Sequence, residues 1–334
     1  MTRFRKYFCR HASETLVRFA ILAVIVVCYS FVYDPVKYGY VFAGTDMFGY
    51  PQYAFAFNYI NTPVTVAMII AALELAPLKK RTNLDRLFSI PIGRTALALA
   101  HFVNGALQIT ALLALNMLVA FLRVVKYYGQ IEMRYMIVQL FFTLLLTLAL
   151  YAISMFSFDR ANNIVDGVIF IIFGSMIAMP IVGLINLFAD LDKVLFDSLD
   201  YIPAALSYSL DRSFSKAFNG DGFELYPEVL NPFIAFLVLG VAATVGYFCL
   251  FKRCKSEDVG GISDRLIGYK IGIPLYSYWL LLLIDSTSMI ATIILVLVSM
   301  LVGYIVFRRG VRFGRSDIVM MSLALAWVLL GFIF

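Results

Sequence analysis

The chain contains only two histidines, and one of them, His101, lies near two amides in a pattern that could support chemistry. His101, Asn104 and Gln108 follow at i, i+3 and i+7, so a helix would carry them on one face. A metal centre there would need further ligands, such as a second histidine or a clustered carboxylate. None is close to His101 in sequence, and no HExxH motif is present. The sequence therefore predicts no metal site.

A catalytic role for this histidine has no supporting motif. A buried serine nucleophile needs a histidine partner, and His101 would be the candidate. No G-x-S-x-G motif accompanies it. Polar side chains within apolar helices commonly bond to a neighbouring helix. We therefore expect the face of His101, Asn104 and Gln108 to pack against another helix, and we expect no catalytic residues and no enzyme activity.

The elements that position these residues are predicted to be membrane-spanning helices. The 334 residues are 62% hydrophobic and only 14% charged, whereas soluble domains average about 25% charged residues. A span needs about 20 mostly apolar residues. The sequence predicts an all-α bundle of about nine spans in a single domain, 1–334. The predicted spans are 16–33, 63–79, 95–122, 136–157, 164–188, 229–251, 271–285, 288–307 and 317–334.

The distribution of basic residues sets the predicted orientation. If the N-terminus is cytoplasmic, the inner segments hold 20 Lys and Arg and the outer segments hold 7. Basic residues favour the cytoplasmic side, so we expect a multi-pass protein of the plasma membrane with its N-terminus inside. The net charge of +6 then follows from topology and from anionic lipid, and no nucleic-acid partner is implied.

Two carboxylates lie near the ends of predicted spans. Asp166 begins the fifth span, and Glu74 lies near the inner end of the second. Both could be interfacial. Glu74 could instead pair with a basic residue such as Lys79 or Arg81 and set the angle of the loop that follows.

Two segments outside the spans have amphipathic patterns. Residues 1–15 carry aromatic and basic side chains at helical spacing, as an interfacial helix would, although a basic anchor explains them equally well. Residues 189–228 form the predicted outer loop, which could fold into short helices or rest on lipid.

The predicted inner loop 81–94 combines a short helix with a sharp turn. Thr82 or Asn83 could cap the helix. Leu84 and Phe88 at i and i+4, with a leucine between them, give it one apolar face. Pro91 is expected to end it, because the residue before a proline avoids the helical region.

This loop resembles the "SLPISR" loop of permeases of the type-2 class of ABC exporters from bacteria. The run Ser89-Ile90-Pro91-Ile92-Gly93-Arg94 lies between the predicted second and third spans, as it does in that family. The segment 251–260 resembles the family's "KRRKSExAG" junction, with Cys254 in place of a basic residue and Val259 in place of a small one. Weaker matches are 158–163, which lacks the family's glycine, and 304–315.

The resemblance implies a function in transport. The family's permeases pair in the membrane, as two copies or as two related chains, and bind cytoplasmic ATPase subunits. The loop 81–94 would then be a coupling helix that contacts the ATPase, and ATP would be bound by that partner. The residues that would couple to it are Arg81, Asp85, Arg86, Ser89, Pro91 and Arg94. The chain itself has no G-x-x-x-x-G-K-[ST] motif, so no cofactor site is expected.

Two alternatives to an ATP-driven exporter stay open. One is a secondary transporter driven by an ion gradient, although the sequence shows no inverted repeat and no pair of broken helices. The other is a non-catalytic membrane scaffold or sensor subunit. Neither the residues nor the resemblance names a transported substrate.

Overall fold

The computed structural model describes the larger part of the chain. The residues described are 2–32, 40–45, 51–56, 61–128, 133–176, 227–254, 257, 259–261, 263, 269–274, 289–308, 310–311 and 313–333. The predicted outer loop 189–228 therefore lies almost entirely outside the described residues, as do the second halves of the predicted spans 164–188 and 271–285.

The described part is helical apart from one hairpin. The prediction of a helical fold is therefore confirmed in its main feature. The helices are α1 (Thr2–Val32), α3 (Asn61–Leu75), η1 (Ala76–Lys79), α4 (Arg81–Phe88), α5 (Arg94–Tyr128), α6 (Met133–Arg160), α7 (Ile164–Met176), α10 (Pro227–Phe251), α12 (Met289–Arg308) and α13 (Arg315–Ile333). Strands β1 (Tyr40–Thr45) and β2 (Pro51–Ala56) pair antiparallel, with Tyr40 opposite Ala56. The sequence analysis did not predict this hairpin.

Four of the described helices are long and apolar enough to cross a membrane, as expected of a membrane protein. They are the segments Arg3–Ser30, Arg94–Tyr127, Leu140–Arg160 and Phe233–Phe251. Large apolar side chains on their outer surfaces, such as Val17, Leu107 and Val241, are exposed, as lipid-facing residues are. The total of nine spans stays a prediction.

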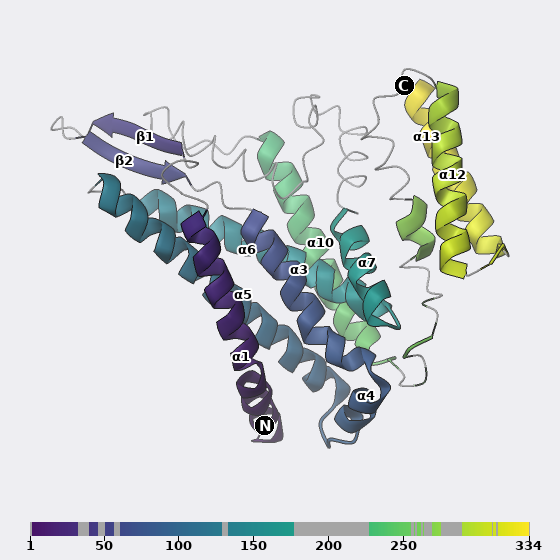
Figure 1. Cartoon of the computed structure of the whole chain (residues 1–334), viewed down its shortest axis with the longest axis horizontal. Coiled ribbons are helices and arrows are strands. Elements are labelled where there is room, and N and C mark those ends of the chain that lie inside the picture. The colour runs from purple at the N-terminus through teal and green to yellow at the C-terminus, as the bar shows by residue number, and fades with distance from the viewer. Residues whose placement is uncertain are drawn as a thin grey trace.

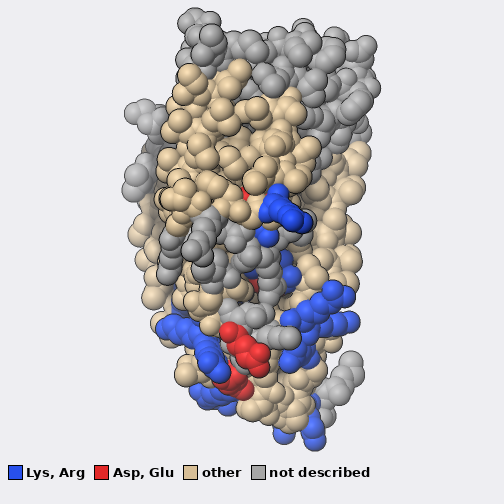
Figure 2. Space-filling model, turned by 90° about the vertical axis from the view of Figure 1, so that its right-hand side faces the viewer, with Lys and Arg blue, Asp and Glu red and all other residues tan. Residues whose placement is uncertain are grey.

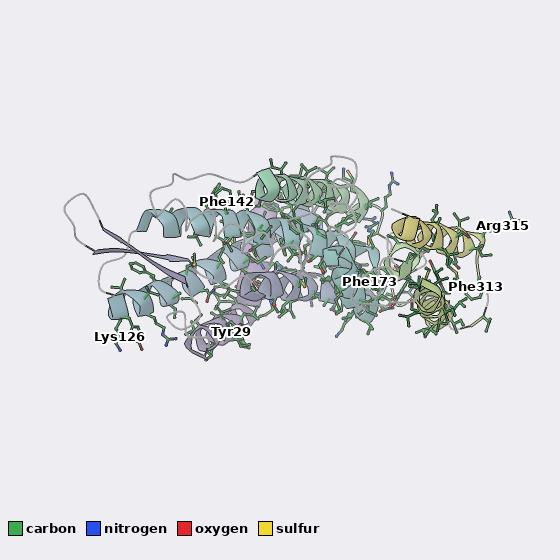
Figure 3. The ribbon with its side chains drawn as sticks, turned by 90° about the horizontal axis from the view of Figure 1, so that it is seen from above. Tyr29, Lys126, Phe142, Phe173, Phe313 and Arg315 are labelled. Atoms are coloured by element: carbon green, nitrogen blue, oxygen red, sulfur yellow. The ribbon has the colours of Figure 1, made fainter. Side chains whose placement is uncertain are left out.

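Helix α6 lies at the centre of the bundle. It contacts α3, α5, α7 and α10, while α1 packs mainly on α5 (Figure 1). Seen from above, α12 and α13 lie beside this bundle, and Phe173 of α7 is on the side nearest to them (Figure 3). Buried residues of α12, among them Met300 and Tyr304, form a separate apolar cluster with Ile273.

Close helix packing in the bundle depends on small residues. A Cβ atom added at Gly240 of α10 would lie 2.7 Å from the Cα atom of Ala149 in α6. Glycine therefore lets the two backbones approach, as small residues do between membrane helices. Contacts of this kind hold α6 and α10 together where hydrophobic burial contributes little against lipid.

Helix α1 contains residues 2–15 of the segment expected to be an interfacial helix, and the interfacial position stays a prediction. These residues from Thr2 onward are helical, but the helix continues without interruption to Val32. No glycine or proline interrupts the sequence over this range, so nothing forces a bend. The aromatic and basic residues of the N-terminal turns are thus a rigid extension of the helix.

Charged side chains are unevenly distributed along the bundle. Figure 2 shows Lys and Arg mainly in the lower half of the face that it presents, and this is the end at which α4 and the N-terminus lie in Figure 1. This is the end that the sequence analysis expects in the cytoplasm, and the orientation stays a prediction.

Candidate functional site

A carboxylate lies buried in the bundle, that of Glu74 in the last turn of α3. Its side chain is fully buried. The Oε2 atom lies 2.9 Å from His11 Nε2 and 3.2 Å from His101 Nδ1. The Oε1 atom accepts hydrogen bonds from Arg18 and, at 2.8 Å, from Asn104 Nδ2.

Helices α1 and α5 bring these partners together because each carries them on one face. His11 and Arg18 are separated by seven residues, or two helical turns of α1. His101 and Asn104 are separated by three residues of α5, which packs directly on α1 and α3. We call these five residues, together with Gln108, the Glu74 cluster.

The predicted role of the amide face is confirmed. Asn104 Nδ2 and Gln108 Nε2 each donate to Thr15 Oγ1 of α1 at 3.1 Å. Gln108 also reaches Glu74 Oε1, at 3.5 Å. The face therefore bonds across to two neighbouring helices, as expected from its i, i+3, i+7 spacing.

Of the two roles left open for Glu74, the pairing with Lys79 or Arg81 is wrong. The carboxylate points into the bundle toward α1, where Arg18 neutralises it. Lys79 is buried elsewhere and Arg81 is exposed. Lys79 lies five residues and Arg81 seven residues beyond Glu74, across η1, so the chain has already turned away from the carboxylate.

The sequence analysis also missed His11 as a partner of His101. The ring centroids are 4.2 Å apart and the rings are roughly perpendicular, at 64°. The two residues are 90 positions apart, so local spacing gave no direct signal. The available signal was indirect: a carboxylate in an apolar helix needs cationic or donor partners, and His11 and Arg18 share one face of the neighbouring basic helix.

Burial explains why so many donors surround one acid. An ionised carboxylate removed from water is stable only when it is paired and its lone pairs are hydrogen-bonded. Arg18 supplies the charge, while the amides of Asn104 and Gln108 supply neutral donors on the same oxygen. The imidazoles of His11 and His101 occupy the other oxygen.

Helix α4 forms the predicted helix of the inner loop. It spans Arg81–Phe88, so it begins before Thr82 and Asn83, which were expected to cap it. Its N-cap is Lys80, without a side-chain capping bond. Leu84 is buried against the bundle. The extended backbone at Lys80 starts the helix two or three residues earlier than a cap at Thr82 or Asn83 would.

The six residues predicted to contact the ATPase lie on the exposed side of α4 and of the turn that follows it. Arg81, Asp85, Arg86, Ser89, Pro91 and Arg94 are all exposed. The Ser89 hydroxyl donates to the Arg86 carbonyl at 2.7 Å, and the helix ends at Phe88, shortly before Pro91 as predicted. The exposed charges thus stand on a helix that its buried leucine fixes to the bundle.

Arg94 makes contacts with a segment that is distant in sequence. It donates to the carbonyl oxygens of Lys252 at 2.9 Å and Cys254 at 3.1 Å. Its guanidinium also lies 4.5 Å from the ring centre of Phe88. Two segments on which the family resemblance was based, 89–94 and 251–260, therefore touch in the structure.

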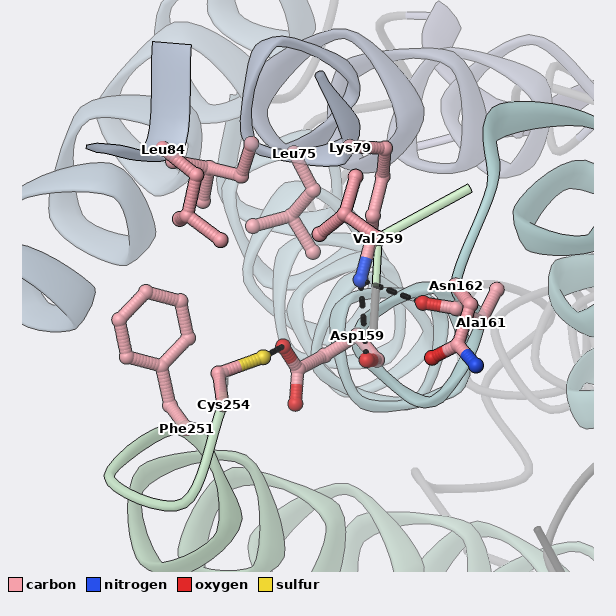
Figure 4. A pocket seen from close by; sticks show the side chains of 10 residues that line it. Leu75, Lys79, Leu84, Asp159, Ala161, Asn162, Phe251, Cys254 and Val259 are labelled. Carbon is pink, nitrogen blue, oxygen red and sulfur yellow. Dashed lines mark hydrogen bonds between the residues drawn. The ribbon is translucent and has the colours of Figure 1, made fainter. Parts of the chain in front are cut away.

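Behind α4, a small pocket joins three helix ends (Figure 4). Lys79, at the end of η1, donates to the carbonyl oxygens of Asp159 at 3.0 Å and Ala161 at 2.7 Å. These two carbonyl groups lie at the C-terminal end of α6. An ammonium group there also offsets the negative end of the helix dipole. Leu84 of α4 and Phe251 of α10 line the same pocket.

Asp166, the second carboxylate that the sequence marked, stabilises the start of α7. Its Oδ2 atom accepts from Ser263 Oγ and its Oδ1 atom from the Tyr269 hydroxyl, both at 2.6 Å. Burial, together with this bond, raises the pKa of Tyr269 well above its usual value. Asp166 therefore ties α7 to the segment that follows α10.

No protein-family model, curated protein or solved structure matches this chain.

Proposed function

We propose that this chain is the membrane-spanning permease subunit of an ATP-driven exporter in a bacterial plasma membrane, with α4 as the element that binds a separate ATPase subunit. The observation that supports this function best is α4 itself. It is a short helix at the basic end of the bundle, with exposed charges at Asp85 and Arg86 and with Leu84 buried beneath them.

A coupling element must transmit force without bending, and the contacts of α4 suit this role. Its N-terminal side continues through η1 into α3. Lys79 connects η1 to the end of α6, and Arg94 connects the start of α5 to the end of α10. A displacement of α4 would therefore move the ends of four long helices together.

The proposed cycle assigns ATP to the partner. Closure of the ATPase subunits on ATP would move the two α4 helices of a paired membrane unit and open the path outward. The second half of that unit would be another copy of this chain or a related permease. The lipid bilayer surrounds both halves, and this chain contributes no nucleotide-binding residues.

Purification of the complex tests the proposal. The tagged chain is extracted from its own host in mild detergent, and copurifying proteins are identified by mass spectrometry. We expect a stoichiometric ATPase with a phosphate-binding loop, lost in Arg86→Glu and retained in Lys126→Glu. Both residues are exposed and basic, but Lys126 lies at the far end of α5, so it controls for the charge change alone.

The buried Glu74 cluster favours one second candidate, a carrier driven by an ion gradient. Ionisable residues inside membrane helices often lie on ion pathways. Reconstituted protein that transports its substrate on an imposed proton or sodium gradient, without ATPase or ATP, and loses transport in Glu74→Gln would replace the exporter proposal.

A further inference from the structure

The two histidines of the chain and one acid point their ligand atoms at a common space. His11 Nε2, Glu74 Oε2 and His101 Nδ1 all lie within 4.8 Å of one another. The shorter two separations, both to the carboxylate oxygen, are 2.9 and 3.2 Å. The residues come from α1, α3 and α5, so the arrangement is a product of tertiary packing.

These separations suit a tetrahedral metal ion. Zinc binds histidine nitrogen and carboxylate oxygen at about 2.0–2.2 Å, which places neighbouring ligand atoms about 3.3–3.5 Å apart. The two measured separations differ from this range by a few tenths of an ångström. Two histidines and one glutamate form a ligand set that zinc sites use, with a fourth position left for water or another ligand.

The residues around the three ligands could hold them in place by hydrogen bonds, as the residues around a metal site usually do. A metal-binding histidine usually donates its second ring nitrogen to a nearby acceptor, and a ligating carboxylate is itself hydrogen-bonded. The Tyr7 hydroxyl lies 3.3 Å from His101 Nε2, and the Tyr7 ring stacks parallel to that of His11. Asn104 fixes Glu74 from the opposite oxygen.

The positive charge of Arg18 opposes a bound cation. Its guanidinium binds Oε1 of Glu74, the oxygen that faces away from the histidines. The carboxylate would then bridge the arginine and the ion, one charge on each oxygen. Arg18 keeps Oε2 directed at the imidazoles, and its positive charge weakens the binding without blocking the position.

We propose that His11, Glu74 and His101 form a binding site for one divalent transition-metal ion of the zinc type, which would fasten α1 to α3 and α5. The His11 side chain is 12% exposed and gives access from the basic end of the bundle, whereas His101 is 2% exposed. The site is independent of the proposed transport function.

Direct metal binding tests this site. The full-length chain is purified in detergent with a tag that lacks histidine, and with Cys9, Cys28, Cys249 and Cys254 changed to serine, because thiolates bind zinc. Zinc is titrated against a chromogenic chelator, and cobalt is added separately to detect tetrahedral coordination by its visible absorption. We expect one ion per chain and a tetrahedral cobalt spectrum.

Variants separate this site from adventitious binding. His11→Gln and His101→Gln should each abolish stoichiometric binding, and Tyr7→Phe should weaken it by about tenfold or more, the effect typical of outer-shell residues. Glu14→Gln, an exposed acid on α1 that pairs with Arg10, should leave binding unchanged. His11→Gln is the critical variant. Because the His11 side chain is partly exposed, we expect this variant to fold, and monodisperse elution from a size-exclusion column verifies that it does.

Two results would overturn the proposal. One is a folded parent protein that binds neither zinc nor cobalt. The other is stoichiometric binding that persists in the folded His11→Gln variant or in the double variant with His101→Gln.

Discussion

Replacement of Glu74 by glutamine should destabilise the bundle strongly. The change keeps the size and shape of the side chain but removes its charge. Glu74 is fully buried, while its charged partner Arg18 is 21% exposed. The substitution therefore leaves the guanidinium of Arg18 in the bundle without a counter-charge. An uncompensated charge of this kind lowers the stability of the folded state strongly.

The magnitude follows from the partners of each carboxylate oxygen. Removal of one member of a buried ion pair costs about 3–5 kcal/mol. A glutamine would present one carbonyl oxygen and one amide nitrogen. If its oxygen faces Arg18 and Asn104, its nitrogen faces the imidazoles, which can accept a hydrogen bond from it. We therefore expect a loss near the lower limit, about 3 kcal/mol.

The assay is equilibrium unfolding of the purified chain in mixed micelles, followed as the denaturing detergent is increased. Glu14→Gln is the matched control. Its carboxylate pairs with Arg10 at 2.9 Å but is 60% exposed, and an exposed pair of this kind contributes about 0.3–0.5 kcal/mol. A Glu74→Gln variant no less stable than Glu14→Gln would refute the argument that the Glu74 cluster holds α1 against α3 and α5.

Three further predictions concern helix ends, helix packing and orientation. Lys79→Met should cost about 1–3 kcal/mol in the same unfolding assay, since it leaves the last carbonyls of α6 without this donor; an unchanged midpoint would contradict that role. Gly240→Leu should destabilise by about 1–3 kcal/mol through overpacking against Ala149, whereas Gly303→Leu, at a glycine that meets only the side chain of Ile273, should cost less; equal effects would show that the α6–α10 approach is not special. In a cysteine-free background, Asp85→Cys should react with an impermeant maleimide only in inverted vesicles and Lys126→Cys only in intact cells; the reverse pattern would invert the topology.

The local features of the fold could be predicted from sequence because their causes are local. Apolar runs located the long helices, and the positions of Leu84 and Pro91 located α4 and its end. The i, i+3, i+7 spacing of His101, Asn104 and Gln108 correctly indicated a face that bonds to another helix. The last two depend on residues within two helical turns of one another, and the apolar runs depend on one continuous segment each.

The partners of those residues could not be predicted, because they depend on which helices become neighbours. Glu74 has basic residues close in sequence on its C-terminal side, and pairing with one of them was one of two roles that the sequence left open. The packing of α1 against α3 and α5 instead brings Arg18 and His11 to the carboxylate. The contact of Arg94 with the carbonyls of Lys252 and Cys254 likewise spans more than 150 residues, so spacing gave no indication of it.

The central claim, that α4 binds an ATPase, is tested most directly by photo-crosslinking in the host cell. A photoreactive residue is placed at Asp85, on the exposed side of α4, and in a second strain at Lys126 as the control. We expect a covalent product between position 85 and a subunit carrying an ATP-binding loop, and no such product from position 126. Crosslinks from position 85 to lipid alone, in cells where the chain is folded and inserted, would show that α4 does not bind an ATPase.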